Sequence, residues 1–420
     1  MRDIAITLFI VAWLPKVLKA PWIGALLFVW IGLMSPHRFA YDFAYGMPFA
    51  QIVAAATVIG MVFSRQQARY VADAPMIWML LFPIWTCVTF IFALEQDLGW
   101  NRWIEVMKIF ISIHFISALI RTRRQLMVFV AVVTVSVAVF GVKGGLFTMA
   151  AGGSARVYGP PGESFMSDNN AIAVALIMIV PFLGWLGTLV NNKWQRVGMA
   201  VAGLLCLLSI LGTHSRGALL GVIAMLIYLW FKSKRKRIFV ILALFIAPIG
   251  IDFMPAEWTN RMNTIQAYQV DESAQGRLNA WQNAINIAND RPLVGGGFEL
   301  YTKRIFLRYA PNPEDLHSAH SVYFQILGEH GYVGLLIFLS LIASCMLKAR
   351  RTIELCRNRA EFTWAANLSR AVQVSVLGFM VGGAFVNIAY WELLYYILLI
   401  AVFANRIVCA ELMPARKSLA

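Results

Sequence analysis

The chain has 420 residues, of which 60% are hydrophobic and only 14% are charged, and its mean hydropathy is +0.68. Apolar runs of about 18 residues or more recur along its whole length, which excludes a soluble globular protein. The formal net charge is +15. Because the basic residues cluster in short connections between apolar runs, this charge is typical of cytoplasmic loops and argues against a nucleic-acid-binding protein.

Residues 1–35 form a pair of apolar segments interrupted at Pro15 and Pro21. No small-residue cleavage site separates them, so they predict a retained membrane segment and no signal peptide. One span and two short spans both fit this pattern. Further apolar runs lie at 48–64, 75–94, 103–120, 125–148, 168–190, 197–213, 217–231, 238–253, 321–347, 365–388 and 390–407.

Four basic clusters set the expected topology. They lie at 65–69, 121–124, 232–237 and 348–359. If all four face the cytoplasm, the apolar runs alternate without conflict. With both termini on the cytoplasmic side, the sequence predicts an all-α polytopic membrane protein with about 12 transmembrane helices. The alternative, a basic face at 232–237 that binds nucleic acid, is the weaker explanation of that cluster.

The same topology places residues 149–167, the turn around His214 and a long stretch from about 254 to 319 on the outer side. The long stretch exceeds a simple connection and is therefore expected to be functional. Its segment from Gly276 to Asp290 has the apolar spacing of a helix. We therefore expect one membrane domain over 1–420, with 254–319 inserted as an outer loop that carries short helices.

The cysteines give no sign of a disulfide framework or a zinc ribbon. None falls in an expected outer segment, and no CxxC pair occurs. The five are Cys87, Cys206, Cys345, Cys356 and Cys409.

Three arginines on the expected outer side lie in motif-like stretches, namely Arg156, Arg216 and Arg277. An arginine at a membrane interface can simply extend to lipid headgroups. Arg216, however, has the small neighbours Ser215 and Gly217, which let a ligand approach its backbone. Since the guanidinium fork binds two phosphate oxygens at once, three such arginines on one side predict a pyrophosphate site.

His320 precedes the apolar run at 321–347, and we expect it to begin a helix. A helix N-terminus disfavours added positive charge, so the imidazole should stay neutral and act as a general base. His330 lies about 15 Å farther along that helix and is expected to be structural. Glu314, Asp315, His317 and His320 offer a metal site as the alternative, but no HExxH pattern or i, i+4 histidine pair supports it.

These motifs together resemble the O-antigen ligase (WaaL) family and its relatives, the O-antigen polymerases (Wzy) and the bacterial protein O-oligosaccharyltransferases. The resemblance covers about residues 150–345. The matching pieces, in family order, are Arg156 and Gly159, Asn170 and Ala173, Ser215 to Gly217, Arg277 and Trp281, and His320, Ser321 and Tyr323. The resemblance implies a GT-C type fold, an undecaprenyl-diphosphate-linked glycan donor, no metal and no cofactor.

The resemblance also implies roles for individual residues. Arg216 and Arg277 would bind the donor diphosphate, with Arg156 as a weaker candidate, and His320 would be the catalytic base. Residues expected to support them are Ser215, Trp281, Ser321, Tyr323 and Asn170. Transfer by direct displacement would invert the anomeric configuration, at the periplasmic face of a bacterial inner membrane.

The acceptor distinguishes the relatives: a lipid A–core sugar, a second glycan chain or a protein hydroxyl. We expect no further domain after the last span. This expectation favours the ligase that acts on lipid A–core. A transporter of the same lipid-linked sugar is the alternative from another class. It would place charged residues at mid-membrane depth, whereas the polar groups here gather on one face, which favours an enzyme.

Overall fold

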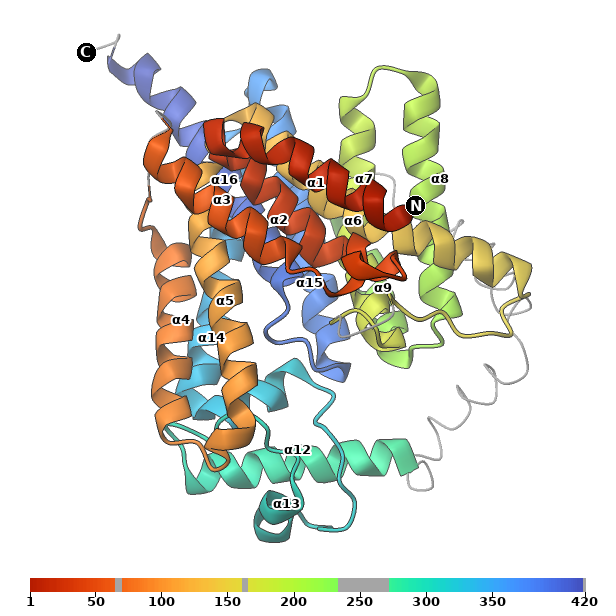
Figure 1. Ribbon diagram of the computed structural model, residues 1–420, viewed down its shortest axis with the longest axis vertical. Helices are drawn as coiled ribbons and strands as arrows, with labels where there is room; N and C mark the ends of the chain where they lie inside the picture. Colours follow the sequence, from red (N-terminus) through yellow and green to blue (C-terminus); the bar gives the residue numbers. More distant parts are fainter. Residues whose placement is uncertain (65–69, 161–164, 233–271, 418–420) are drawn as a thin grey trace.

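The computed structural model describes residues 1–420 except 65–69, 161–164, 233–271 and 418–420 (Figure 1). Across the described ranges the chain forms helices and no strand. The α-helices are α1 Arg2–Lys19, α2 Pro21–Met34, α3 Phe49–Phe63, α4 Ala74–Ile91, α5 Gln96–Leu119, α6 Arg123–Ala150, α7 Asn169–Leu189, α8 Lys193–Gly212, α9 Arg216–Lys232, α12 Glu272–Asp290, α13 Lys303–Tyr309, α14 Val322–Leu355, α15 Thr363–Gly382 and α16 Glu392–Lys417. Short 3₁₀ helices are η1 Pro36–Phe39, η2 Phe43–Gly46, η3 Ala360–Phe362 and η4 Gly383–Phe385.

The predicted apolar runs coincide with helices, apart from 238–253, which lies outside the described residues. Residues 1–35 form two helices that meet at Ala20. The predicted break at Pro15 is wrong, because that residue lies inside α1. The chain turns instead at Ala20, whose φ of −139° and ψ of 81° are non-helical, since a residue before proline is driven out of the helical region.

Seven helical segments in the described part of the chain are long and apolar enough to cross a membrane. They are α4, α6, α7, α8, α14, the segment 360–385 around α15, and most of α16. The helices α2 and α3 are apolar but shorter. The protein is therefore a multi-pass membrane protein, and these seven spans are fewer than the twelve predicted.

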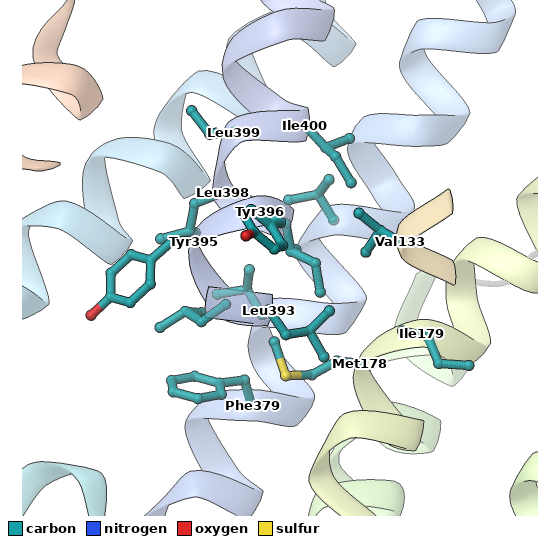
Figure 2. Packing of buried hydrophobic residues seen from close by; sticks show 14 of the residues in the cluster. Val133, Met178, Ile179, Phe379, Leu393, Tyr395, Tyr396, Leu398, Leu399 and Ile400 are labelled. Atoms are coloured by element: carbon teal, nitrogen blue, oxygen red, sulfur yellow. The ribbon is translucent and has the colours of Figure 1, made fainter. Parts of the chain in front are cut away.

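The core of the bundle is α16, in which every residue from Leu393 to Asn405 is buried. It packs against α5, α6, α14 and α15. Figure 2 shows Tyr396 and Leu393 of this helix in the same cluster as Phe379 of α15 and Met178 of α7. A helix that is apolar on all sides is stable only when other helices or lipid surround it, which explains its central place.

Glycines let α7, α9 and α15 approach one another closely. A Cβ added at Gly378 would lie 2.4 Å from Cγ2 of Ile177, and one at Gly221 would lie 3.3 Å from the carbonyl oxygen of Gly378. Small residues at crossings are the usual means by which membrane helices bring their backbones together. This packing holds the first turn of α9 beside η4.

At one end of the bundle, α12 runs across the ends of the other helices, with α13 beneath it (Figure 1). The helix predicted from Gly276 to Asp290 is confirmed as α12. The glycine turn after it contacts α14 at a kink, where Gly331 has φ 67° and ψ −171°. The amide of Gly296 donates to the carbonyl of Gly328, and that of Gly297 to the carbonyl of Glu329, so the backbone groups freed by the kink are satisfied.

Candidate functional site

The segment that leads into α14 is fixed to α12. The Trp281 indole Nε1 donates to the carbonyl oxygen of Ala319 at 2.6 Å, and its ring stacks on Phe324 at 4.8 Å. Two residues earlier on α12, the Asn279 side-chain amide donates to the carbonyls of Asn312 and Asp315. The helix therefore holds the backbone immediately before His320 in place.

The prediction that His320 begins α14 is wrong. That helix begins at Val322, with Ser321 as its N-cap in an extended conformation. His320 itself has φ 43°. This left-handed backbone conformation is uncommon for a residue other than glycine and is typical of a sharp turn. The reason is that Ala319 is held by Trp281 on one side while Ser321 is held on the other, so the chain must turn sharply between them.

The imidazole of His320 is half-buried and lies near two charged groups. Burial lowers the pKa of His320, the Arg277 guanidinium lowers this pKa further, and the Asp168 carboxylate raises it. Near neutral pH the ring is therefore uncharged, because its pKa lies below the usual value of a histidine. The predicted neutral base has this physical basis, with burial and Arg277 as its main causes.

Ser321 and Tyr323 hold the first turn of α14. The Ser321 amide donates to the Asn387 side-chain oxygen at 3.1 Å, and the Tyr323 hydroxyl donates to the carbonyl of Met380 at 2.7 Å. The Ser321 side chain is 1% exposed, and its Oγ has no hydrogen-bond partner among the described residues. That hydroxyl is consequently a buried polar group whose hydrogen-bonding capacity is unused in the described part of the chain.

Arg216 is the first residue of α9, and Ser215 caps this helix by accepting a hydrogen bond from the Ala218 amide at 3.2 Å. A Cβ at Gly217 would lie 2.5 Å from Cβ of Phe385 in η4. The small neighbour of Arg216 thus admits another part of the chain rather than a ligand. Since η4 also lies close to Val322, the starts of α9 and α14 both pack against η4.

The turn between α8 and α9 holds the stretches 156–159 and 168–170 through hydrogen bonds. The Val157 amide donates to the carbonyl of Gly212 at 2.9 Å, and the Asn169 side chain donates to the carbonyl of Thr213 at 2.8 Å. Asp168 caps α7 through the amides of Asn170 and Ala171. The stretches around 156–159 and 168–170 therefore share one support, and Asp168 reaches the surroundings of His320.

The expected site residues do not all fall into one group. Arg277, Trp281, Ser321 and Tyr323 surround or support His320 by the contacts above, and Ser215 positions Arg216. Asn170 contacts its neighbour Asn169 at 3.3 Å. Arg156 lines a cavity with Lys143 of α6, and none of the residues around His320 lines that cavity.

The alternative metal site is not formed. Among the described residues, no three histidine, cysteine or acidic side chains are placed to hold an ion. His317 Nδ1 lies 2.5 Å from Asp315 Oδ1, and Glu314 pairs with Lys303 at 3.3 Å. The His317 ring packs against Gly276, where an added Cβ would lie 2.6 Å from its Nδ1, so it supports α12.

Two supporting residues were missed in the sequence. Asn387 binds the backbone of Ser321, and the Tyr301 hydroxyl lies within hydrogen-bond reach of both the Ala319 backbone and the Asn387 side chain. Each is a single polar residue close to an apolar run, and no motif marks it. Only their contacts with the backbone on either side of His320 reveal the role.

A second polar group lies deeper, along α14. The Tyr390 hydroxyl is hydrogen-bonded to Glu329 and lies 2.7 Å from His330 Nε2, while His330 Nδ1 lies 2.7 Å from Thr89 Oγ1. His330 is 0% exposed. These bonds join α4, α14 and the segment before α16, which agrees with the structural role expected of His330.

Comparison with known proteins finds two families. Residues 201–339 match the family described as O-Antigen ligase, and residues 1–191 match a family of unknown function (DUF5935). The first match contains Arg216, Arg277 and His320, and the second contains Arg156 and Asn170. No curated protein matches the chain.

Proposed function

The chain belongs to the O-antigen ligase family, and from this premise we propose that it is a glycosyltransferase that moves a glycan from undecaprenyl diphosphate to lipid A–core. The observation that carries the proposal is that α12, which bears Arg277, holds the backbone next to the half-buried His320 through the Trp281–Ala319 hydrogen bond. Burial and the Arg277 guanidinium lower the pKa of His320. A neutral base next to a fixed positive charge suits a reaction in which a hydroxyl loses its proton while negative charge develops on a departing diphosphate.

In the proposed reaction, the acceptor hydroxyl oxygen attacks the anomeric carbon of the donor sugar. The new carbon–oxygen bond forms as the bond to the diphosphate breaks, and its electron pair leaves with the diphosphate oxygen. His320 accepts the hydroxyl proton. Because the attack comes from the side opposite the leaving group, the anomeric configuration inverts.

The diphosphate would be held by Arg216 and Arg277. Guanidinium groups can each bind two phosphate oxygens, and they stabilise the growing charge of the leaving group in place of a metal ion. Arg156, a third expected ligand, lines a cavity beside α6 and is not part of this proposal. Ser321 Oγ, buried at the same place, is suited to a hydrogen bond with the donor or the acceptor.

We further propose a GT-C type fold of about twelve spans, with the His320 end of the bundle at the periplasmic face of the inner membrane. The support is the one-sided placement of α12, α13 and the starts of α7, α9 and α14 (Figure 1). Basic residues 348–359 lie at the opposite end of α14, as the positive-inside rule requires of a cytoplasmic side.

Deletion of the gene, followed by analysis of surface and lipid-linked glycans together, tests the proposal. Loss of a ligase leaves long polymer on the lipid carrier and none on lipopolysaccharide. If single repeats remain attached to lipopolysaccharide, the protein is a polymerase. If lipopolysaccharide is unchanged and glycoproteins lose their glycans, the acceptor is a protein.

A transporter is distinguished by the side on which donor accumulates, since its loss strands the donor inside and ligase loss strands it outside. The metal-independent route is tested with purified protein and EDTA. Unchanged transfer is expected. Loss of transfer that zinc restores would contradict the assignment of His320 as a base.

A further inference from the structure

A cavity beside α6 brings together two cations that the proposed transfer site does not use. Lys143 and Arg156 both line it, and its volume is about 220 Å³. Three phenylalanine side chains, Phe39, Phe140 and Phe147, line it too. Phe39 and Phe140 are stacked, with their ring centroids 6.0 Å apart. The cavity thus has a positively charged part and an apolar part.

Lys143 is placed where a charge is costly. It is the only charged residue of α6 after Arg124, and it lies about 10 Å from the end of the helix at Ala150, at about 1.5 Å per residue. On the same helical face lie the exposed apolar residues Val139 and Leu146. In a membrane this face contacts hydrocarbon, where an ammonium group is unfavourable unless an anion or water reaches it.

Neither cation is neutralised within the described part of the chain. No ion pair or side-chain hydrogen bond joins Lys143 or Arg156 to another described residue. Two unpaired cations that line one cavity repel each other and favour an anionic ligand. An anion between them would remove that repulsion and satisfy both charges.

The size of the cavity limits the ligand to a small group. Pockets that take up whole drug-sized molecules measure roughly 300–1,000 Å³, which is larger than the 220 Å³ found here. A phosphate group fits this space, and an oligosaccharide does not. The exposed apolar face of α6 offers a surface to a hydrocarbon chain attached to that phosphate.

From these observations we propose that Lys143 and Arg156 bind the phosphate of a membrane lipid whose hydrocarbon chain lies along α6. None of the residues placed around His320 lines this cavity, and the proposal does not rest on the proposed transfer reaction. The cavity is nevertheless connected to the proposed transfer site: Val157, the residue after Arg156, donates to Gly212 at the turn before α9. A lipid held here lies beside the segment that supports Arg216.

Native mass spectrometry of the full-length, delipidated protein tests the site with three probes: undecaprenyl phosphate, phosphatidylglycerol and the uncharged undecaprenol. We expect Lys143→Ala and Arg156→Ala each to weaken binding of a phosphate-bearing probe by about tenfold, as loss of one charge-assisted hydrogen bond predicts. Lys143→Arg should retain binding, and undecaprenol should bind all variants equally. Unchanged elution on size exclusion shows that each variant is folded.

Lys108→Ala is the matched control, because Lys108 is also an exposed cation on an apolar helix, α5. If Lys108→Ala weakens binding as much as Lys143→Ala, or if neither alanine variant at the cavity weakens it, the site does not exist and Lys143 merely extends to headgroups. Weakening with undecaprenyl phosphate alone assigns the site to the glycan carrier. Weakening with both phosphate probes assigns it to lipid phosphates in general. Transfer activity is not the readout, so failure of the proposed function leaves this test intact.

Discussion

Among single residues, Asp168 and Arg277 act on His320 in opposite directions. Both are charged, and they respectively raise and lower the pKa of the imidazole. Asp168 also caps α7, and asparagine caps helices as well as aspartate does. The charge of Asp168 can therefore be removed while its structural contribution is kept.

We expect Asp168→Asn to move the acid limb of the activity profile to lower pH. A general base must be neutral, so transfer is lost as the pH falls through the pKa of His320. Without the nearby carboxylate this pKa is lower, and activity persists to a more acidic pH. The measurement is kcat/KM against pH for purified protein. A limb that stays in place, or moves to higher pH, contradicts the assignment.

Alanine at Arg216 or Arg277 should reduce transfer by about 10²–10³-fold, as removal of one group that stabilises developing charge typically does. Lysine should restore activity only in part, because it keeps the charge and loses the bidentate fork. In Arg277→Ala the pKa of His320 should rise, because the nearby positive charge is gone. The acid limb of the residual activity should therefore lie at a higher pH than in the wild type. His317→Ala, a change of the neighbouring histidine, should keep most activity. Full activity in the alanine variants would show that both arginines only contact lipid headgroups.

At the scale of elements, the contact between α9 and η4 fixes the position of Arg216. A Cβ at Gly217 would lie 2.5 Å from Cβ of Phe385, closer than two such atoms can approach without a shift of the backbone. The start of α9 is also held by its Ser215 cap. The geometry of Arg216 therefore depends on the absence of a side chain at position 217.

Gly217→Ala should lower transfer and the thermal midpoint of unfolding, because α9 and η4 must separate. Gly203→Ala in α8 is the control, since an added Cβ there meets nothing within 4 Å. That substitution should leave transfer unchanged and raise stability by about 0.5–1 kcal/mol, the usual gain of alanine over glycine in a helix. Equal activity in both variants would show that transfer does not depend on the close approach of Gly217 to Phe385.

At the scale of the whole molecule, the orientation in the membrane decides on which side transfer takes place. Lys303 lies at the start of α13, beside α12, and Arg350 lies near the other end of α14. We expect a membrane-impermeant maleimide to label Lys303→Cys in intact cells and to label Arg350→Cys only after permeabilisation. The wild type, with its five native cysteines, provides the background. The reverse pattern would place the His320 end inside and overturn the proposed reaction site.

Helix positions followed from the sequence because their signals are local. Apolar runs, the spacing of Gly276–Asp290 and the proline after Ala20 act within one segment, so the described helices lie where the runs predicted them. The Pro15 break failed because α1 continues past that residue, and its packing against α2 and α3 offsets the backbone hydrogen bond that a proline removes. Likewise, the motifs containing Arg216, Arg277 and His320 could be read from residue types and their order along the chain.

Tertiary structure alone decided which of these residues meet. The left-handed turn at His320 arises from two anchors, Trp281 and Asn387, that are distant in sequence from it and from each other. That Arg156 lines a cavity together with Lys143 also follows from packing, because α6 forms this cavity with the loop after it. Sequence determines local conformation and residue chemistry, but the burial and charge that set the pKa of His320 come from α7 and α12 packing beside it.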